Sequence, residues 1–296
     1  MTTAFGLIII GDEILSGKRA DQHLPKVIDL LGARGLQLSY AEYVGDDPVR
    51  ITATLARAFA AARETGDVVF STGGIGATPD DHTRQCAAKA LGVDLALHPE
   101  ARALIMERMQ EVAKEQGVTY EPDRHDNVHR LNMGVFPVGA EIIPNPYNKI
   151  PGFSCKSGES AVHFVPGFPV MAWPMIEWVL DSRYTPLYQK AAYVEKSVIV
   201  LGSMEAMLTP LMLDIEAAYS GVKVFSLPSV DHPKYGRHIE LGVKAHRMPS
   251  TWLFQPCWQV CTTLILDWVL NWCVKFALRI FYHLYGASRQ DSFLTI

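Results

Sequence analysis

The residues best suited to chemistry lie in a Gly- and Asp-rich segment, Thr72–Thr83, which reads TGGIGATPDDHT. Gly73, Gly74 and Gly76 can take positive φ angles and let the backbone approach a ligand closely. Successive N–H groups could then cradle a phosphate, and the start of a following helix would add the positive end of its dipole. The same glycines would equally make a tight strand-to-helix turn with no ligand, so both interpretations stay open.

Acidic residues occur in pairs here and in two other segments: Asp80-Asp81, Asp46-Asp47 and Asp12-Glu13. We expect one of Asp80 and Asp81 to cap the helix that follows. A second carboxylate beside a phosphate repels it unless a divalent cation such as Mg²⁺ bridges the two. Helix capping by the second pair and turn formation by the third are also compatible with the sequence.

Short apolar runs and helical stripes alternate along the first part of the chain. The expected strands are 5–10, 38–44, 67–71 and 161–165, and the expected helices are 21–33, 48–59, 80–91, 99–116 and 171–180. Continuous apolar runs are typical of strands buried on both faces, and strands that alternate with helices pair in parallel. The pattern predicts an α/β fold: a three-layer, doubly wound, mostly parallel sheet.

Ligands of such sheets bind beyond the carboxyl ends of the strands. Five loops that follow expected strands or precede helices should meet at that edge: 11–13, 44–47, 72–81, 145–146 and 166–169. The residues expected to contact a phosphate or other ligand there are Gly11, Asp12, Glu13, Thr72, Gly73, Gly74, Gly76, Thr78, Asp80, Thr83, Asn145, Pro166 and Gly167. This convergence indicates a ligand site more strongly than any single motif does.

Composition excludes several classes of protein. The 296 residues are 49% hydrophobic with a formal charge of −4, which excludes a disordered chain and makes a broad nucleic-acid surface unexpected. Five cysteines do not make a disulfide framework, and no export signal is evident, so we expect a cytoplasmic protein. Gly11 and Gly17-Lys18 imitate a phosphate-binding P-loop, but the spacing is one residue too long and Arg19 replaces the required Ser or Thr.

The last part of the chain differs from the rest. Residues 246–296 hold four of the six Trp and three of the five Cys but few charges. Asp267, Lys275 and Arg279 interrupt its apolar run, so we do not expect a membrane span. A helix packed on the preceding unit and an out-of-frame end both remain open. We therefore expect three parts, with boundaries 1–185, 190–245 and 246–296, the second being a small α/β domain.

The residues from Gly6 to Leu180 resemble the molybdopterin-binding-like domain shared by MoaB, MogA and the N-terminal part of the CinA (competence/damage-inducible) proteins. The motifs that carry this resemblance are GDEILSG at 11–17, VGDD at 44–47 and TGGIGATPDDHT at 72–83. NP at 145–146, PGF at 151–153 and PGFP at 166–169 are similar to the CinA-type branch.

The resemblance implies an often homo-oligomeric protein that binds a nucleotide or pterin phosphate, with molybdopterin as one candidate ligand. In the CinA branch the domain is associated with metal-dependent hydrolysis of ADP-ribose to AMP and ribose 5-phosphate. In the molybdenum-cofactor branch it serves adenylyl transfer with Mg²⁺. Either chemistry would use Asp81 with Asp46 or Asp47, and we expect Asp81 and Asp47 to hold the metal. A binding module without turnover is a third interpretation.

The chain departs from the family at several positions. His23 stands where Asn is usual, Val170 lies near a usual Glu, and Tyr147-Asn148-Lys149 lacks the usual Gly. These changes fall around the expected pocket, so the resemblance does not by itself transfer the substrate. We also expect the nicotinamide-nucleotide deamidase activity of longer CinA proteins to be absent, because it belongs to an additional C-terminal domain.

Overall fold

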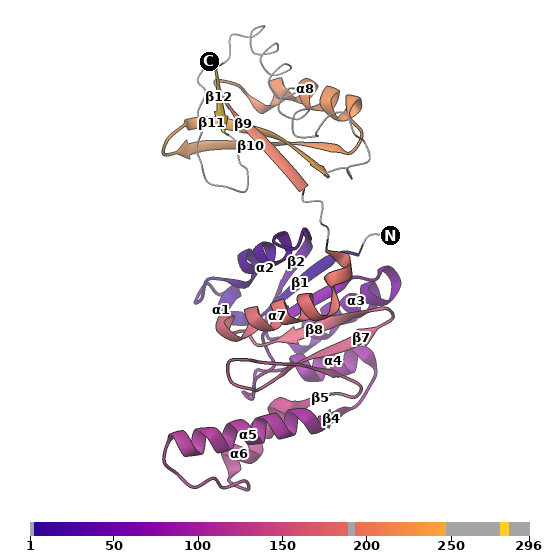
Figure 1. The fold of residues 1–296 in the computed structure, drawn as a ribbon, viewed down its shortest axis with the longest axis vertical. Coiled ribbons are helices and arrows are strands. Elements are labelled where there is room, and N and C mark those ends of the chain that lie inside the picture. The colour runs from indigo at the N-terminus through magenta and orange to yellow at the C-terminus, as the bar shows by residue number, and fades with distance from the viewer. Residues whose placement is uncertain (1–2, 189–192, 247–278, 284–296) are drawn as a thin grey trace. The chain divides into compact units, whose positions relative to one another are not determined.

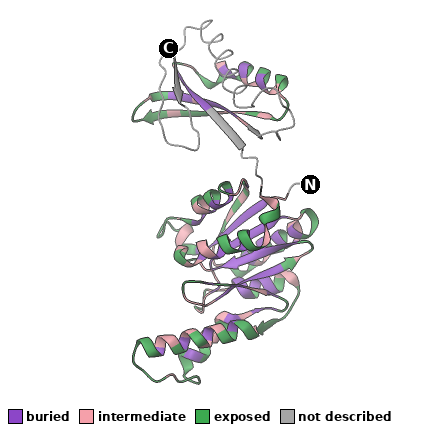
Figure 2. Ribbon diagram, viewed as in Figure 1, coloured by how far each residue is buried: buried purple, intermediate pink, exposed green. Residues whose placement is uncertain are grey.

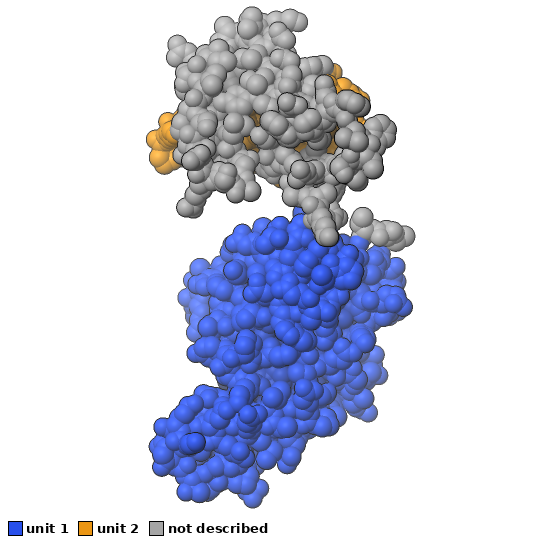
Figure 3. All heavy atoms as spheres, in the orientation of Figure 1, with its two compact units in different colours: residues 1–188 blue, residues 189–296 orange. Residues whose placement is uncertain are grey.

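The computed structural model describes residues 3–188, 193–246 and 279–283. The chain forms two compact units, Met1–Tyr188 and Gln189–Ile296, which we describe separately (Figure 3).

A six-stranded sheet forms the centre of the first unit (Figure 1). Its order is β2 (Leu38–Val44), β1 (Phe5–Ile10), β3 (Val68–Thr72), β8 (Ser160–Val165), β7 (Gly152–Ser157) and β6 (Glu141–Ile143). The pairs β1–β2, β1–β3 and β3–β8 are parallel, whereas β8–β7 and β7–β6 are antiparallel. The predicted mostly parallel α/β fold is confirmed. The antiparallel strands at one side were not expected from the sequence.

Helices cover both faces of this sheet and make three layers. On one face lie α2 (His23–Gly32) and α7 (Pro169–Arg183), packed on side chains that include Leu7 and Ile9. On the other face lie α3 (Pro48–Thr65) and α4 (Thr83–Leu91), which enclose Ile8 and Ile10. Alternate β1 residues therefore enter two separate cores, which explains why the whole strand is buried and apolar (Figure 2).

An extension of the first unit lies between β3 and β6 in the sequence. It contains β4 (Leu95–Leu97), α5 (Pro99–Glu115), α6 (His125–Arg130) and β5 (Val135–Pro137), with β4 and β5 paired as a two-stranded sheet (Figure 1). Lys149, from the loop after β6, ties α5 to the main body by ion pairs with Glu107 (2.7 Å) and Glu111.

The second unit is a small α/β domain. Its antiparallel sheet has the order β10 (Val222–His232), β11 (Gly236–His246), β9 (Tyr193–Leu201) and β12 (Arg279–His283), and α8 (Glu205–Ala218) packs on it. Of the compositionally distinct end, 246–296, the structure describes only His246 and β12; the alternatives for the remainder lie outside the described residues. None of the helices described is both long and apolar enough to cross a membrane.

Candidate functional site

The loops after β1 and β2 are joined by a reciprocal pair of aspartates. Gly11 N–H donates to Val44 O (3.0 Å), which brings the two strand ends together. Asp12 N–H donates to Asp46 Oδ2 at 2.9 Å, and Asp46 N–H donates to Asp12 Oδ1 at 3.2 Å. Each carboxylate is thus held by the other residue's backbone, and each keeps one oxygen that accepts no hydrogen bond from the described residues.

Negative charge is crowded at this edge. Partial burial raises the pKa of Asp46, and although the Asp12 N–H lowers it, the charges of Asp12, Glu13 and Asp80 raise it further. The carboxylates of Asp12, Glu13 and Asp80 therefore lie close enough to Asp46 to repel its ionised form. A cation would relieve that repulsion.

The two residues of the Asp46-Asp47 pair have separate roles. Asp47 is the N-cap of α3, where its Oδ1 accepts from Val49 N–H at 2.8 Å. Its other oxygen lies 3.8 Å from Arg50 Nε, in an exposed ion pair. The sequence left open which of the two caps the helix, and the structure shows that Asp46 alone faces Asp12.

The turn after β3 requires glycine. Gly73 has φ +96° and Gly74 has φ +67°, and a Cβ on Gly73 would lie 2.2 Å from Ile10 O. Gly73 N–H donates to Val165 O, but the next four N–H groups, from Gly74 to Ala77, find no acceptor in the described part of the chain. Such a run of free N–H groups is suited to an anion.

Asp81 does not cap α4, so the expectation that one of the Asp80-Asp81 pair does so is wrong. The helix begins at Thr83, and its N-cap, His82, makes no side-chain cap. Asp81 Oδ2 turns back to accept from Thr78 N–H (2.8 Å) and Thr78 Oγ1. Thr83 N–H, the first of the helix, donates to Gly74 O, so the turn itself satisfies one of the N–H groups that the helix start leaves free.

Arg84 is a site residue that the sequence reasoning missed. Its side chain is only 4% exposed; Nη2 donates to Gly76 O at 2.5 Å, and Nε and Nη1 have no partner among the described residues. Burial lowers the pKa of Arg84, and the Asp81 charge opposes this. A cavity of about 570 Å³ is lined by Asp81, Arg84 and His129, so the turn faces the α6 segment. The signal available in the sequence was the position of the cationic Arg84, three residues after Asp81.

The loop after β8 lies against the glycine turn. A Cβ on Gly167, which follows Pro166, would meet Gly73 Cα at 3.4 Å. His23, buried at the start of α2, donates from Nε2 to Gly167 O (3.0 Å), so its departure from the family pattern directly touches the site. Thr72, at the end of β3, has a buried hydroxyl without a partner in the described structure.

The loop after β6 is shaped by Asn145. β6 runs parallel to β8, so this loop lies at the same edge of the sheet. Asn145 is 5% exposed; Oδ1 accepts from Tyr147 N–H and Nδ2 donates to Ile150 O. Its polar atoms are therefore used to hold the loop. Lys149 takes φ +65°, a left-handed conformation that favours the glycine usual in this stretch.

The structure thus places Asp12, Glu13, Asp46 and Asp80 near one another, and Gly73 against Gly167. Asp47 and Asn145 serve local structure. Over the described ranges, no three His, Cys, Asp or Glu side chains are arranged to hold a metal ion.

Sequence comparisons find known relatives of this chain. A family model described as "Probable molybdopterin binding domain" matches residues 6–186. A protein of Pyrobaculum arsenaticum is 31% identical over 213 residues, which are 71% of this chain and 74% of the relative. A CinA-like protein of Anaeromyxobacter dehalogenans is 31% identical over 220 residues, 73% of this chain and 50% of the relative. This chain therefore spans about half the length of that relative.

Among solved structures, a CinA protein of unknown function from Thermoplasma acidophilum shares 27% identity at a TM-score of 0.49, covering 61% of this chain and 98% of that one. The chain belongs to the molybdopterin-binding-domain family and is a CinA-like member of it.

Proposed function

We propose that the chain is a metal-dependent nucleotide pyrophosphatase that hydrolyses an ADP-ribose-like substrate to AMP and a sugar phosphate. The observation that carries this proposal is the reciprocal Asp12–Asp46 pair at the same sheet edge as the free N–H groups of Gly74–Ala77. Oxygen donors and an anion cradle are what a phosphoanhydride with a divalent cation requires.

The donor set fits a hard divalent cation such as Mg²⁺. Asp12 and Asp46 each keep one carboxylate oxygen free, and Asp46 is destabilised as an anion by its acidic neighbours. We assign these two residues to the metal, in place of Asp47, because Asp47 is bound to the α3 backbone. When bound, the cation would neutralise phosphate charge, and waters could complete the coordination that the protein supplies only in part.

The chain's own residues would perform the remaining steps. The N–H groups of Gly74–Ala77 bind phosphate oxygens, and Asp81, held by Thr78, presents its other oxygen to orient a water molecule. Water adds across the phosphoanhydride: its oxygen forms a P–O bond, the bridging P–O bond breaks, the leaving phosphate departs as an anion, and the proton that the water loses passes to solvent. Gly73 and Gly167 keep the turn rigid at this point.

A metal-by-substrate screen tests the proposal. The full-length protein is incubated with ADP-ribose and with ATP plus molybdopterin, in Mg²⁺, Mn²⁺ or EDTA, and AMP, ribose 5-phosphate and adenylated pterin are measured. We expect metal-dependent AMP release that is lost in Asp46→Asn and Asp81→Ala but kept in Glu121→Gln, an exposed control. Adenylated pterin alone would favour the adenylyltransferase alternative, and tight binding without any product would favour a binding module.

Metal binding is measured separately from turnover. We expect Mg²⁺ to raise the melting temperature of the parent protein because it binds only the folded carboxylate pair. Asp46→Asn should abolish that increase, whereas Asp47→Ala, which removes the N-cap of α3, should lower the melting temperature without changing the response to Mg²⁺. Equal responses in both variants would contradict the assignment of Asp46.

A further inference from the structure

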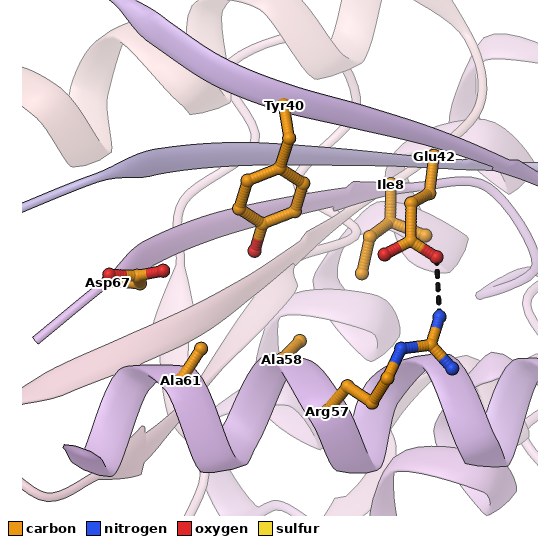
Figure 4. A pocket seen from close by; sticks show the side chains of 7 residues that line it. All are labelled: Ile8, Tyr40, Glu42, Arg57, Ala58, Ala61 and Asp67. Atoms are coloured by element: carbon orange, nitrogen blue, oxygen red, sulfur yellow. Dashed lines mark hydrogen bonds and ion pairs between the residues drawn. The ribbon is translucent and has the colours of Figure 1, made fainter. Parts of the chain in front are cut away.

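A second cavity lies between the edge strand β2 and helix α3. It has a volume of about 250 Å³ and is lined by Ile8, Tyr40, Glu42, Arg57, Ala58, Ala61 and Asp67 (Figure 4). An adjoining cavity of about 640 Å³ shares Glu42 and Arg57 with it and is also lined by Asp12 and Gly45. The two together make a path along β2 from the carboxylate edge to Asp67.

Tyr40 forms an aromatic wall of this cavity. It lies opposite Gly6 of β1, and a Cβ on Gly6 would lie only 2.3 Å from Tyr40 Cζ. The glycine inside an otherwise apolar strand therefore makes room for the ring. Figure 4 shows the side chain pointing from β2 toward α3, between Asp67 and Glu42. Its hydroxyl makes no hydrogen bond with the described residues.

Asp67 supplies a buried acceptor. It is 9% exposed, and Oδ1 accepts from Thr65 Oγ1 at 2.7 Å, whereas Oδ2 accepts no hydrogen bond from the described part of the chain. Burial, together with the charges of Asp67 and Glu42, raises the pKa of Tyr40 to about 12. The Tyr40 hydroxyl therefore stays protonated at neutral pH and can donate.

The remaining walls come from α3 and from an ion pair. Ala58 and Ala61 on α3 are small, so the space between the helix and the Tyr40 ring stays open. At the end nearer the carboxylates, Arg57 Nη2 pairs with Glu42 Oε2 at 2.6 Å. The cavity thus offers one carboxylate oxygen and one hydroxyl beside the two alanines of α3.

We propose that this cavity binds the adenine base of a nucleotide whose phosphates lie at the Asp12–Asp46 edge. Val44 lies four positions after Tyr40, about 13 Å along the strand, a span comparable to that of a nucleoside monophosphate. The exocyclic amino group donates to Asp67 Oδ2, and a ring nitrogen accepts from the Tyr40 hydroxyl. The inference rests on the proposed function and adds the part of the substrate that gives specificity.

Calorimetric titrations of the full-length protein with AMP, IMP and ribose 5-phosphate test the subsite. IMP carries a carbonyl in place of the amino group, so we expect AMP to bind about tenfold more tightly than IMP. In Asp67→Asn the amide oxygen keeps the Thr65 contact and the NH₂ group faces the cavity, so the preference should reverse toward IMP. A merely structural role of Asp67 would weaken both nucleotides equally.

Two further variants keep the test decisive if Asp67→Asn is unstable. Ala61→Met fills the cavity, and we expect it to weaken AMP at least about tenfold while leaving ribose 5-phosphate unchanged. Glu64→Gln, on the exposed face of the same helix, is the control and should bind like the parent.

The outcomes separate the subsite from the proposed reaction. If AMP binds more tightly than IMP but ADP-ribose is not hydrolysed, the adenine subsite is supported and the proposed function is contradicted. If ADP-ribose is hydrolysed but AMP and IMP bind equally, or if Ala61→Met binds AMP like the parent, the subsite is overturned. Absence of AMP binding also overturns it.

Discussion

Gly45→Ala should impair hydrolysis strongly while lowering the stability of the fold only slightly. Gly45 directly precedes Asp46 in the chain and lies against the Asp12 side chain. A Cβ at Gly45 would lie 2.4 Å from Asp12 Oδ1, whereas ordinary van der Waals contacts begin at 3.4 Å. The Asp12 carboxylate must therefore move by about 1 Å, a displacement that can cost about a hundredfold in rate when it affects a catalytic group. We expect AMP release from ADP-ribose to fall by that factor.

The accompanying loss of stability should be small. The shift breaks the Asp12–Asp46 hydrogen bonds of 2.9 and 3.2 Å, each worth about 1 kcal/mol. Separating two like charges and lowering the entropy of the unfolded chain offset part of this loss, the latter by about 0.4–1 kcal/mol. The net decrease in the free energy of unfolding should be about 1 kcal/mol, measured by urea denaturation.

Gly32→Ala is the matched control, because a Cβ at that helical position meets nothing within 4 Å. It should stabilise the protein by about 0.5–1 kcal/mol and leave hydrolysis unchanged. Parent-level hydrolysis in Gly45→Ala, with the substitution confirmed by sequencing and mass, would refute the role given to the aspartate pair.

Three other predictions concern the turn, the carboxylates and the core. Gly73→Ala should lower the free energy of unfolding by about 3 kcal/mol or more, because φ at this position is +96° and the new Cβ would lie 2.2 Å from Ile10 O. Urea denaturation measures this loss, and a loss below about 1 kcal/mol would contradict the prediction. The raised pKa of Asp46 predicts that Mg²⁺ binding weakens as pH falls through that pKa. Glu13→Gln, which removes one repelling charge and neither of the two proposed metal ligands, should move this loss to lower pH in a Mg²⁺ titration, and an unchanged profile would contradict the coupling. Burial lowers the pKa of His163 in the folded protein to about 3, below the ordinary value of 6.5. The contribution of neutral His163 to stability is therefore complete above pH 6.5 and is lost as pH falls from about 6.5 toward 3. This single group should add a slope of up to about 1.4 kcal/mol per pH unit, and urea denaturation across that range should show a shallower slope in His163→Gln than in the parent.

Much of the fold was predictable from local sequence. The strand 5–10 matches β1, because an apolar run bounded by turn residues specifies a buried strand directly. The strand 38–44 matches β2, an edge strand whose residues alternate between partly buried and exposed positions up to the buried Val44. Asp21 was expected at the start of a helix, and its carboxylate accepts from the N–H groups of His23 and Leu24. Capping and periodicity are properties of neighbouring residues, so the sequence displays them.

Roles that depend on direction were not predictable. Asp46 and Asp47 are adjacent and chemically identical, yet one faces Asp12 and the other caps α3. Asp81 looked like a helix cap but bonds to Thr78, because the turn itself satisfies the first helical N–H. Which way a carboxylate points depends on backbone angles that only the folded loop sets.

The sequence by itself determined the glycines and acids of the site edge and the elements that carry them. Only the tertiary structure decided that Tyr40 lies across Gly6 and faces Asp67, since these residues come from three different strand segments. Burial of Arg84 and the free oxygen of Asp67 likewise follow from packing. Hydrophobic pattern specifies which residues enter a layer, but the contacts between layers depend on how distant segments meet.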